Sequence, residues 1–276
     1  GTTVLILHDA TELDSTSKTT LFDDLGQIGQ GTQRGYICHN SLAVRADTKA
    51  TLGLTSQILH HRADVPKGET PKQKRERADR ESRLWVQGAK QSGALPEASG
   101  WIVDVSDSLS DTFEYMAQEC HTGRHFVLRS KENRTLGKPV GGEQYLHDAV
   151  RTLSEVLEYD LKIPAKPGQK ARTAHLKMSF TEVLVSPPAR KTGEYPNQPL
   201  PLWAFPLWEP KPPQDVEPLE WILLTNVPVE TAEDAREIVS WYECRFVIEE
   251  YHKGMKTGCG IEQLQLTTIE RLDPVH

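Results

Sequence analysis

Short apolar runs, most of them rich in β-branched residues, recur along the first 130 residues and limit the folds that this chain can adopt. Residues 4–7 (VLIL) are followed by His8 and Asp9, which is typical of a strand buried on both faces with polar residues at its carboxyl end. Similar runs predict strands at 35–46, 51–60, 100–107 and 125–130, and the segments between them predict helices at 72–90 and from Ser108 to about Cys120. This order of elements indicates an α/β protein with a mixed sheet.

The second half of the chain has a different texture. From Lys131 to about Pro218, Pro and Lys are frequent, and strand-like runs at 176–186 and 200–208 alternate with turn residues. A last strand is expected at 220–225, and residues 231–234 (TAED) form a capping box before a long helix that runs to about Thr257. We therefore expect three segments: the first part of a core (1–130), a β-rich insertion (131–218), and a final strand and helix that complete the core (219–276).

Apolar runs and cysteine spacing exclude two classes of protein. No apolar run approaches the roughly 20 residues that cross a bilayer, and the first residues lack the basic leader of a signal peptide, so we expect a cytoplasmic protein that does not bind membranes. The four cysteines form no CxxC pair, which argues against a disulfide framework or a zinc knuckle. Cys38-His39 and Cys120-His121 are weak zinc candidates, because adjacent residues on a strand point to opposite faces.

Charge is distributed unevenly along the chain. The net charge of −7 argues against a nucleic-acid-binding protein if only the total is considered. Residues 67–90, however, hold eight basic residues against four acids, and a second basic stretch covers residues 162–177. Such segregation is what local contacts with DNA require, although a solvated helix face explains most of these side chains individually.

The last predicted helix carries two stripes of different character. One stripe is polar and contains Tyr242, Arg245, Glu249, Lys253 and Lys256, at steps of 3, 4, 4 and 3 residues. The other is mostly apolar and contains Trp241, Cys244, Ile248, Tyr251 and Met255, so we expect it to face the core. From spacing alone, a salt-bridged solvent face is the more common explanation of the polar stripe.

The identities of the residues in this helix add to the evidence from their spacing. The segment WYECRFVIEEYHKGMKTG (241–258) resembles the Y-x2-R-x3-E-x6-K signature of the DDE transposases of insertion sequence family four, and EWILLTNVPVE (220–230) is similar to the same family. Four further blocks resemble that family in its order: HDATELD, RESRLW, VDVSDSLSD and FVLRSK. The resemblance implies a ribonuclease-H-like mixed sheet flanked by helices, with a β-rich insertion before the catalytic helix, and a DNA transposase that cuts and joins strands.

The resemblance also implies the roles of particular residues. Asp9, Asp107 and Glu249 would be the catalytic acids and would hold two Mg²⁺ ions, for which Mn²⁺ is expected to substitute, at the phosphodiester that is cut. Water would nick the transposon end, the freed 3′-hydroxyl would form a hairpin, and the reopened end would attack target DNA. The DNA-binding residues would be Arg129, Trp221, Tyr242, Arg245 and Lys256, together with Lys253 on the same stripe. Transposon-end and target DNA would be the partners, and the full-length protein would act as a homodimer.

Each acid has a simpler alternative role. Asp9 is suited to a turn after a strand, Asp107 to a helix cap, and Asp104 and Asp111 compete with Asp107 for the second catalytic position, which only the resemblance assigns. Glu250 lies about 100° from the polar stripe of its helix, so Glu249 is preferred. Two other functions stay open: a ribonuclease-H-like nuclease that never joins strands, and a relic that binds DNA without cutting it.

The sequence departs from the family pattern in places. Ser108 and Leu109 stand where the family has an Arg and then an acidic residue or glycine, and Leu84 replaces a Lys. These changes leave the three acids intact but remove expected DNA contacts. The family's amino-terminal DNA-binding helices and carboxy-terminal dimerisation helices have no counterpart in the sequence, from which we expect an excised catalytic core.

Overall fold

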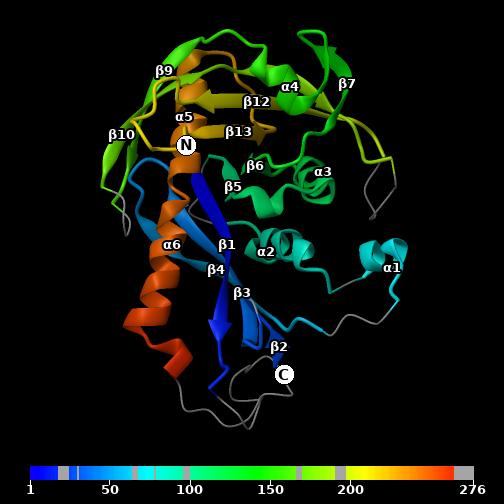
Figure 1. Ribbon diagram of the computed structural model, residues 1–276, viewed down its shortest axis with the longest axis vertical. Coiled ribbons are helices and arrows are strands. Elements are labelled where there is room, and N and C mark those ends of the chain that lie inside the picture. Colours follow the sequence, from blue (N-terminus) through cyan, green and yellow to red (C-terminus); the bar gives the residue numbers. More distant parts are fainter. Residues whose placement is uncertain are drawn as a thin grey trace. The chain divides into compact units, whose positions relative to one another are not determined.

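A computed structural model describes residues 1–17, 25–29, 31–63, 68–77, 79–95, 100–165, 170–189 and 197–263. The chain is a mixed α/β protein in which a large sheet of parallel and antiparallel strands is flanked by a few helices (Figure 1). The predicted fold class is therefore confirmed, and the arrangement is compatible with a ribonuclease-H-like fold. The chain divides into two compact units, residues 1–105 with 244–276, and residues 106–243.

The first unit contains a sheet with the strand order β2-β3-β1-β5, and β4 also pairs with β3. Strand β1 runs antiparallel to β3 over its whole length, from Val4 opposite Arg45 to Asp14 opposite Gly35. The strands are β1 (Val4–Asp14), β2 (Gly26–Gln27), β3 (Arg34–Arg45), β4 (Thr51–His60) and β5 (Ile102–Ser106). The helical segments are α1 (Pro71–Glu76), η2 (Glu81–Arg83), α2 (Leu84–Ser92), α6 (Phe246–Lys253), a π-turn η4 (Gly254–Gly258) and η5 (Ile261–Gln263).

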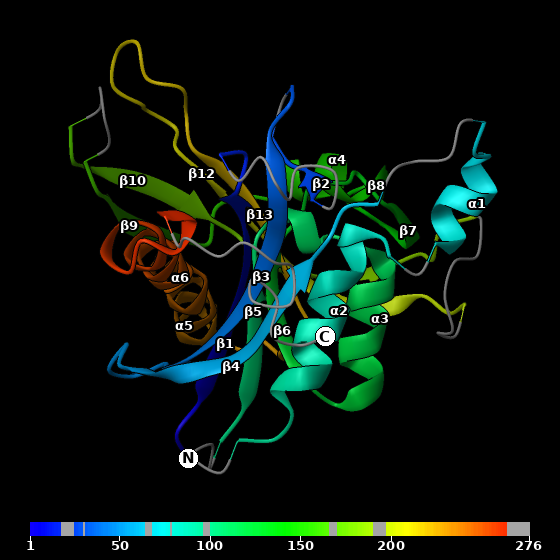
Figure 2. The same cartoon turned by 90° about the horizontal axis from the view of Figure 1, so that it is seen from below.

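Helices α2 and α6 lie on opposite faces of this sheet, α2 beside β3 and β4 and α6 beside β1 (Figure 2). Since both faces of β1 are covered, residues 4–7 are completely buried, as the continuous apolar run predicts. Successive side chains of a strand alternate between faces, so His8 and its partner Ser41 lie on the α2 face. Asp9 and its partner Asn40 lie on the α6 face.

Strand β1 is longer than its apolar run predicts. We expected Asp9 at the carboxyl end of the strand, but β1 continues through Asp14. The reason is its pairing with β3, which continues residue by residue to Gly35. The main-chain hydrogen bonds of this pairing do not depend on whether the side chains are apolar or polar. Asp9 is therefore an interior strand residue, which also excludes its alternative role as a turn former.

The second unit has the strand order β6-β13-β12-β11-β7-β8, with β10 paired to β12 and β9 paired to β10. The predicted insertion, residues 131–218, lies within this unit and contributes β7 to β12 and α4. The strands are β6 (His125–Arg129), β7 (Thr135–Val140), β8 (Glu143–Tyr145), β9 (Leu157–Ile163), β10 (Arg172–Met178), β11 (Thr181–Val185), β12 (Leu200–Trp208) and β13 (Glu220–Thr225). The helical segments are η3 (Ser108–Ser110), α3 (Phe113–Thr122), α4 (Leu146–Arg151) and α5 (Ala232–Glu243).

Three predicted elements are divided in the structure. The helix expected at 72–90 is three pieces, because Arg77 leaves the helical conformation at ψ 131° and α2 begins only at Leu84. The strand expected at 176–186 is β10 and β11, separated by two residues. The long last helix is α5 and α6, separated by Cys244 and Arg245, where the backbone bonds tighten to the i→i−3 type.

Helix caps were predicted correctly at one place and wrongly at another. Thr231 and Asp234 cap each other's backbone N–H groups before α5, as a capping box requires. Helix α3 does not begin at Ser108, where the sequence predicts its start. Asp107 caps the short helix η3 instead, and α3 begins five residues later with Thr112 as its N-cap, because the Thr112 hydroxyl accepts the N–H of Tyr115.

A cluster of polar side chains is buried on the α2 face of the first unit. His8 Nε2 lies 2.6 Å from Asp104 Oδ1, and His8 Nδ1 lies 2.9 Å from the hydroxyl of Ser41. The ring of His39 stacks on His8 and meets the edge of Trp85, with centroids 5.6 and 5.2 Å apart. Among the described residues, no hydrogen-bond partner meets either ring nitrogen of His39. Burial, aided by His8 and His252, holds the pKa of His39 well below its usual value, so its ring is neutral.

Gly88 of α2 gives this cluster its space, and Gly88→Ala is expected to lower the free energy of unfolding by about 1–3 kcal/mol. A Cβ at this position would lie 2.5 Å from Cε1 of His39 and 2.9 Å from Oγ of Ser41, and both of these side chains are completely buried. Urea denaturation of both proteins measures the difference.

Gly254→Ala is the matched control. Gly254 has φ −58°, and a Cβ there would meet nothing within 4 Å, so the substitution should be neutral or stabilise by up to about 1 kcal/mol. Equal effects of the two substitutions would show that contact with His39 does not decide the cost.

Candidate active site

The α6 face of β1 presents Asp9, the first of the predicted catalytic acids. Its side chain is only 14% exposed, and its Oδ1 accepts the backbone N–H of Ala10 at 2.9 Å. Its Oδ2 lies 3.9 Å from Nη1 of Arg245 and 3.7 Å from Nδ1 of His252. The carboxylate therefore has two basic neighbours, both from the region of α6.

Arg245 also contacts Glu249, the predicted acid of α6. Its Nη2 donates a hydrogen bond to Oε1 of Glu249, one helical turn further along. A single guanidinium thus serves two carboxylates that lie at opposite ends of the sequence. Glu249 is 46% exposed, so this acid is accessible from solvent while Asp9 is largely enclosed. Folding of the first unit therefore brings two of the three predicted acids to one place.

His252 completes this group and was not predicted from the sequence. Its Nε2 lies 3.0 Å from the amide nitrogen of Asn40, whose amide oxygen accepts a hydrogen bond from Gln57 at 2.9 Å. This arrangement makes Nε2 an acceptor and leaves the proton on Nδ1, toward Asp9. Burial, with a further contribution from the charge of Lys256, lowers the pKa of His252 to about 4, so the ring is neutral at pH 7. The position of His252, three residues after Glu249 on the helix, is the signal that could have identified it.

Asp107, the remaining predicted acid, belongs to the second unit. It follows β5 directly, and its Oδ1 accepts the N–H of Leu109 at 2.9 Å. The helix-capping role that competed with catalysis is therefore present. Within the described part of the chain, however, its Oδ2 accepts no hydrogen bond and no basic side chain forms an ion pair with it. A cap that uses one oxygen leaves the other available to a ligand.

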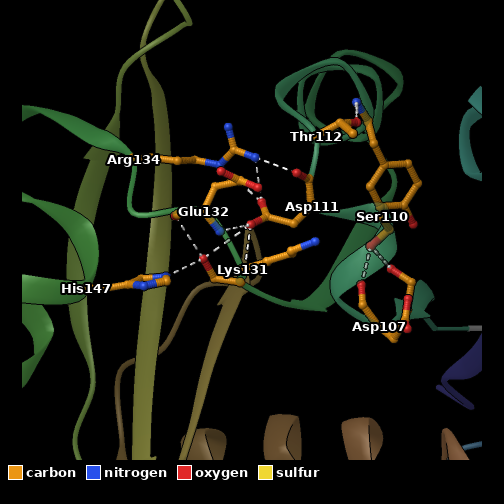
Figure 3. Close-up of polar contacts among 11 residues, drawn as sticks. Asp107, Ser110, Asp111, Thr112, Lys131, Glu132, Arg134 and His147 are labelled. Carbon is orange, nitrogen blue, oxygen red and sulfur yellow. Dashed lines mark hydrogen bonds and ion pairs between the residues drawn. The ribbon is translucent and has the colours of Figure 1, made fainter. Parts of the chain in front are cut away.

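The two aspartates that competed with Asp107 for the second catalytic position both have buried partners of their own. Asp104 is completely buried against His8 in the first unit. The carboxylate of Asp111 is buried among the backbone N–H groups of Lys131 and Glu132 and the guanidinium of Arg134 (Figure 3). Neither can take up a metal ion without breaking buried polar contacts, which favours Asp107 on physical grounds.

Trp221 and Tyr242 lie together in the second unit. Their rings meet edge to face with centroids 5.2 Å apart. Trp221 is half-buried at the start of β13, and Tyr242 is only 4% exposed near the end of α5. The burial of Tyr242 does not fit the explanation of the polar stripe as a solvent face, and the helix expected to carry the whole stripe is interrupted after Glu243.

The other predicted DNA-binding residues are basic side chains with weak or exposed partners. Arg129, at the end of β6, has a long hydrogen bond of 3.4 Å to the hydroxyl of Ser108. Lys253 lies 3.8 Å from Glu250, and Lys256 lies 3.7 Å from Glu262. In the part of the chain that the structure describes, neither lysine forms an ion pair with Glu249, whereas Arg245 does.

Part of the positive charge of the two basic stretches is neutralised by ion pairs where the structure describes them. Lys72 lies 3.9 Å from Glu76, and Arg77 pairs with Asp79 at 2.5 Å. In the second stretch, Arg172 pairs with Glu209 and Lys177 pairs with Glu155. Lys67 lies outside the described residues. These stretches supply less free positive charge than their sequences suggest.

Among the described residues, no group of three or more His, Cys, Asp and Glu side chains is arranged to hold a metal ion. All four cysteines are free thiols, and no described helix is long and apolar enough to cross a membrane. A search against models of known protein families found no match.

Proposed function

We propose that this chain is the catalytic core of a DDE-type DNA transposase, a metal-dependent enzyme that cuts DNA strands at transposon ends and joins them to target DNA. The observation that carries the proposal is the group formed by Asp9, Arg245 and Glu249, in which two distant acids share one cation. An ordinary surface ion pair joins one acid to one cation. Two acids that share one guanidinium could instead bind a metal ion in its place.

The donor set of these acids fits divalent magnesium. Carboxylate oxygens are the ligands that Mg²⁺ and Mn²⁺ prefer, and Arg245 supplies the positive charge that keeps Asp9 and Glu249 together without a metal. With Asp107 as the third ligand, two bound ions would stabilise the attacking and leaving oxygens of an in-line displacement. Arg245 would then be released from Glu249 to bind a DNA phosphate, for which a planar guanidinium is well suited.

Neutral His252 has a separate positioning role in this proposal. Its Nδ1 proton faces Asp9 Oδ2, while Asn40 fixes the opposite ring nitrogen. A neutral donor orients the carboxylate without adding a charge that would compete with a metal ion. Arg129, Lys253 and Lys256 would bind further phosphates, and Trp221, backed by Tyr242, would stack on a base turned out of the duplex. The proposal includes a cytoplasmic location, where bacterial DNA lies, and a homodimer in the full-length protein.

The experiment that tests this function compares the parent chain with Asp107→Asn in a joining assay. A pool of duplex oligonucleotides with random terminal sequences is incubated with plasmid DNA and Mg²⁺, and joined molecules are sequenced. We expect joined product from the parent, and about a thousandfold or greater loss in the variant, because a lost metal ligand removes several kcal/mol of transition-state stabilisation.

Asp215→Asn is the matched control, since Asp215 is an exposed acid of the same unit and its loss should leave joining unchanged. Cleavage without joined product would replace the proposal by a nuclease. DNA binding with neither reaction would replace it by a DNA-binding relic.

A further inference from the structure

A small polar pocket lies within the second unit, between the end of β6, helix α4 and strand β13. Its volume is about 220 Å³, below the roughly 300–1,000 Å³ of clefts that hold drug-sized ligands. Its lining includes Arg129, Ser130, Lys131, His147, Arg151 and Glu220. The size and the polar lining suit a small charged group better than an extended apolar ligand.

The charges around this pocket are unbalanced. Glu220 is the single acid in the lining, and it binds Arg151 in a bidentate pair, with Nε to Oε1 at 2.8 Å and Nη2 to Oε2 at 3.0 Å. Arg129 and Lys131 have no carboxylate partner among the described residues. Burial and the nearby charge of Arg151 lower the pKa of His147, so the histidine adds no charge at pH 7. The pocket therefore carries excess positive charge that an anion would neutralise.

The walls of the pocket are fixed by contacts outside it. The N–H of Ser130 donates to the carbonyl of Ile222 on β13 at 2.7 Å, and the Ser130 hydroxyl lies 2.9 Å from Nε2 of His147 on α4. The buried carboxylate of Asp111 accepts the next backbone N–H, that of Lys131, at 2.7 Å. These contacts hold the backbone that carries Arg129 and Lys131, and the ring of His147, at fixed places around the pocket.

We propose that this pocket binds a phosphodiester group of the DNA backbone, with His147 and Arg151 of α4 as one wall and Arg129 and Lys131, at and just after the end of β6, as the other. The inference rests on the proposed function for the identity of the ligand, and it adds residues of the insertion to the DNA-binding surface. Glu220 acts as an internal competitor that holds Arg151 until a phosphate takes its place. Bidentate binding of Arg151 to a carboxylate has the same geometry as its binding to a phosphate.

Opposite effects of two substitutions test the proposal. Binding of a DNA duplex to the full chain is measured without metal over a series of salt concentrations, so that the result does not depend on catalysis. Arg151→Gln should weaken binding about tenfold and reduce the salt dependence by about one ion. Glu220→Gln should tighten binding about two- to fivefold, because it removes a repulsive charge and frees Arg151.

Arg236→Gln is the control, since it removes the same charge from α5, outside the pocket. Lys131→Gln provides a second test that leaves the pair of Arg151 and Glu220 intact, and it should also weaken binding. Unchanged DNA binding in all three pocket variants overturns the proposal. If the variants alter only the binding of inorganic phosphate, the pocket binds a free anion, and the proposal that it binds the DNA backbone is wrong. Loss of joining activity with these binding results intact would contradict the proposed function instead.

Discussion

Glu249→Gln is expected to reduce Mg²⁺-dependent DNA cleavage by about a thousandfold or more, whereas Glu250→Gln, one residue further along α6, should leave the rate within about twofold. Both substitutions replace a carboxylate by an amide of the same shape on an exposed position of one helix. They differ in direction: Glu249 faces Arg245 and, through it, Asp9, while Glu250 pairs with Lys253. An amide cannot supply the negative charge that a hard divalent ion requires.

Binding of Mn²⁺ followed by calorimetry separates this effect from misfolding. Glu249→Gln should weaken Mn²⁺ binding while urea denaturation shows unchanged stability, since an exposed ion pair contributes at most about 1 kcal/mol. Glu250→Gln should change neither quantity. Equal loss of cleavage in both variants would mean that α6 contributes general negative charge and that Glu249 is not a metal ligand.

Elements with a strong periodic pattern were predicted from the sequence, and elements without one were not. Strands β3, β4, β12 and β13 were predicted within one or two residues, because each is a run of apolar or β-branched residues. Strands β7 to β9 and helix α4 were missed. Their sequences, such as TLGKPV and LEYDLKI, mix charged residues, Gly and Pro with few apolar positions, and they are held by neighbouring strands.

The candidate site was predicted in part for a similar reason. The steps between Arg245 and Glu249 follow from helix geometry, and the structure pairs them. The sequence could not show that Arg245 also approaches Asp9, because that contact depends on β1 lying beside α6. The break at Cys244 was equally hidden, since no Gly or Pro marks it and the amphipathic pattern of apolar residues continues across it. Contacts between distant segments decide both features.

Asp111→Ala is expected to lower the free energy of unfolding by about 3–5 kcal/mol. The side chain of Asp111 is completely buried, and its Oδ2 accepts the N–H groups of Lys131 and Glu132 at 2.7 and 2.8 Å. Its Oδ1 binds Nε and Nη2 of Arg134 at 3.1 and 2.7 Å. Alanine would leave a guanidinium that is only 13% exposed without its carboxylate partner, together with two N–H groups that lose their acceptor.

Asp148→Ala is the matched control in the same unit, because Asp148 is exposed and accepts a single bond from Asn133 at 3.0 Å. Its effect in urea denaturation should be within about 0.5 kcal/mol.

Combining Asp111→Ala with Arg134→Leu should cost less than the sum of the two single changes, because the leucine removes the unpaired charge. Additive losses would show that Asp111 stabilises the loop only through its backbone contacts. Every variant that lacks the Asp111 carboxylate should also bind DNA more weakly. Lys131 lines the neighbouring pocket, and its backbone N–H loses the acceptor that holds it in place.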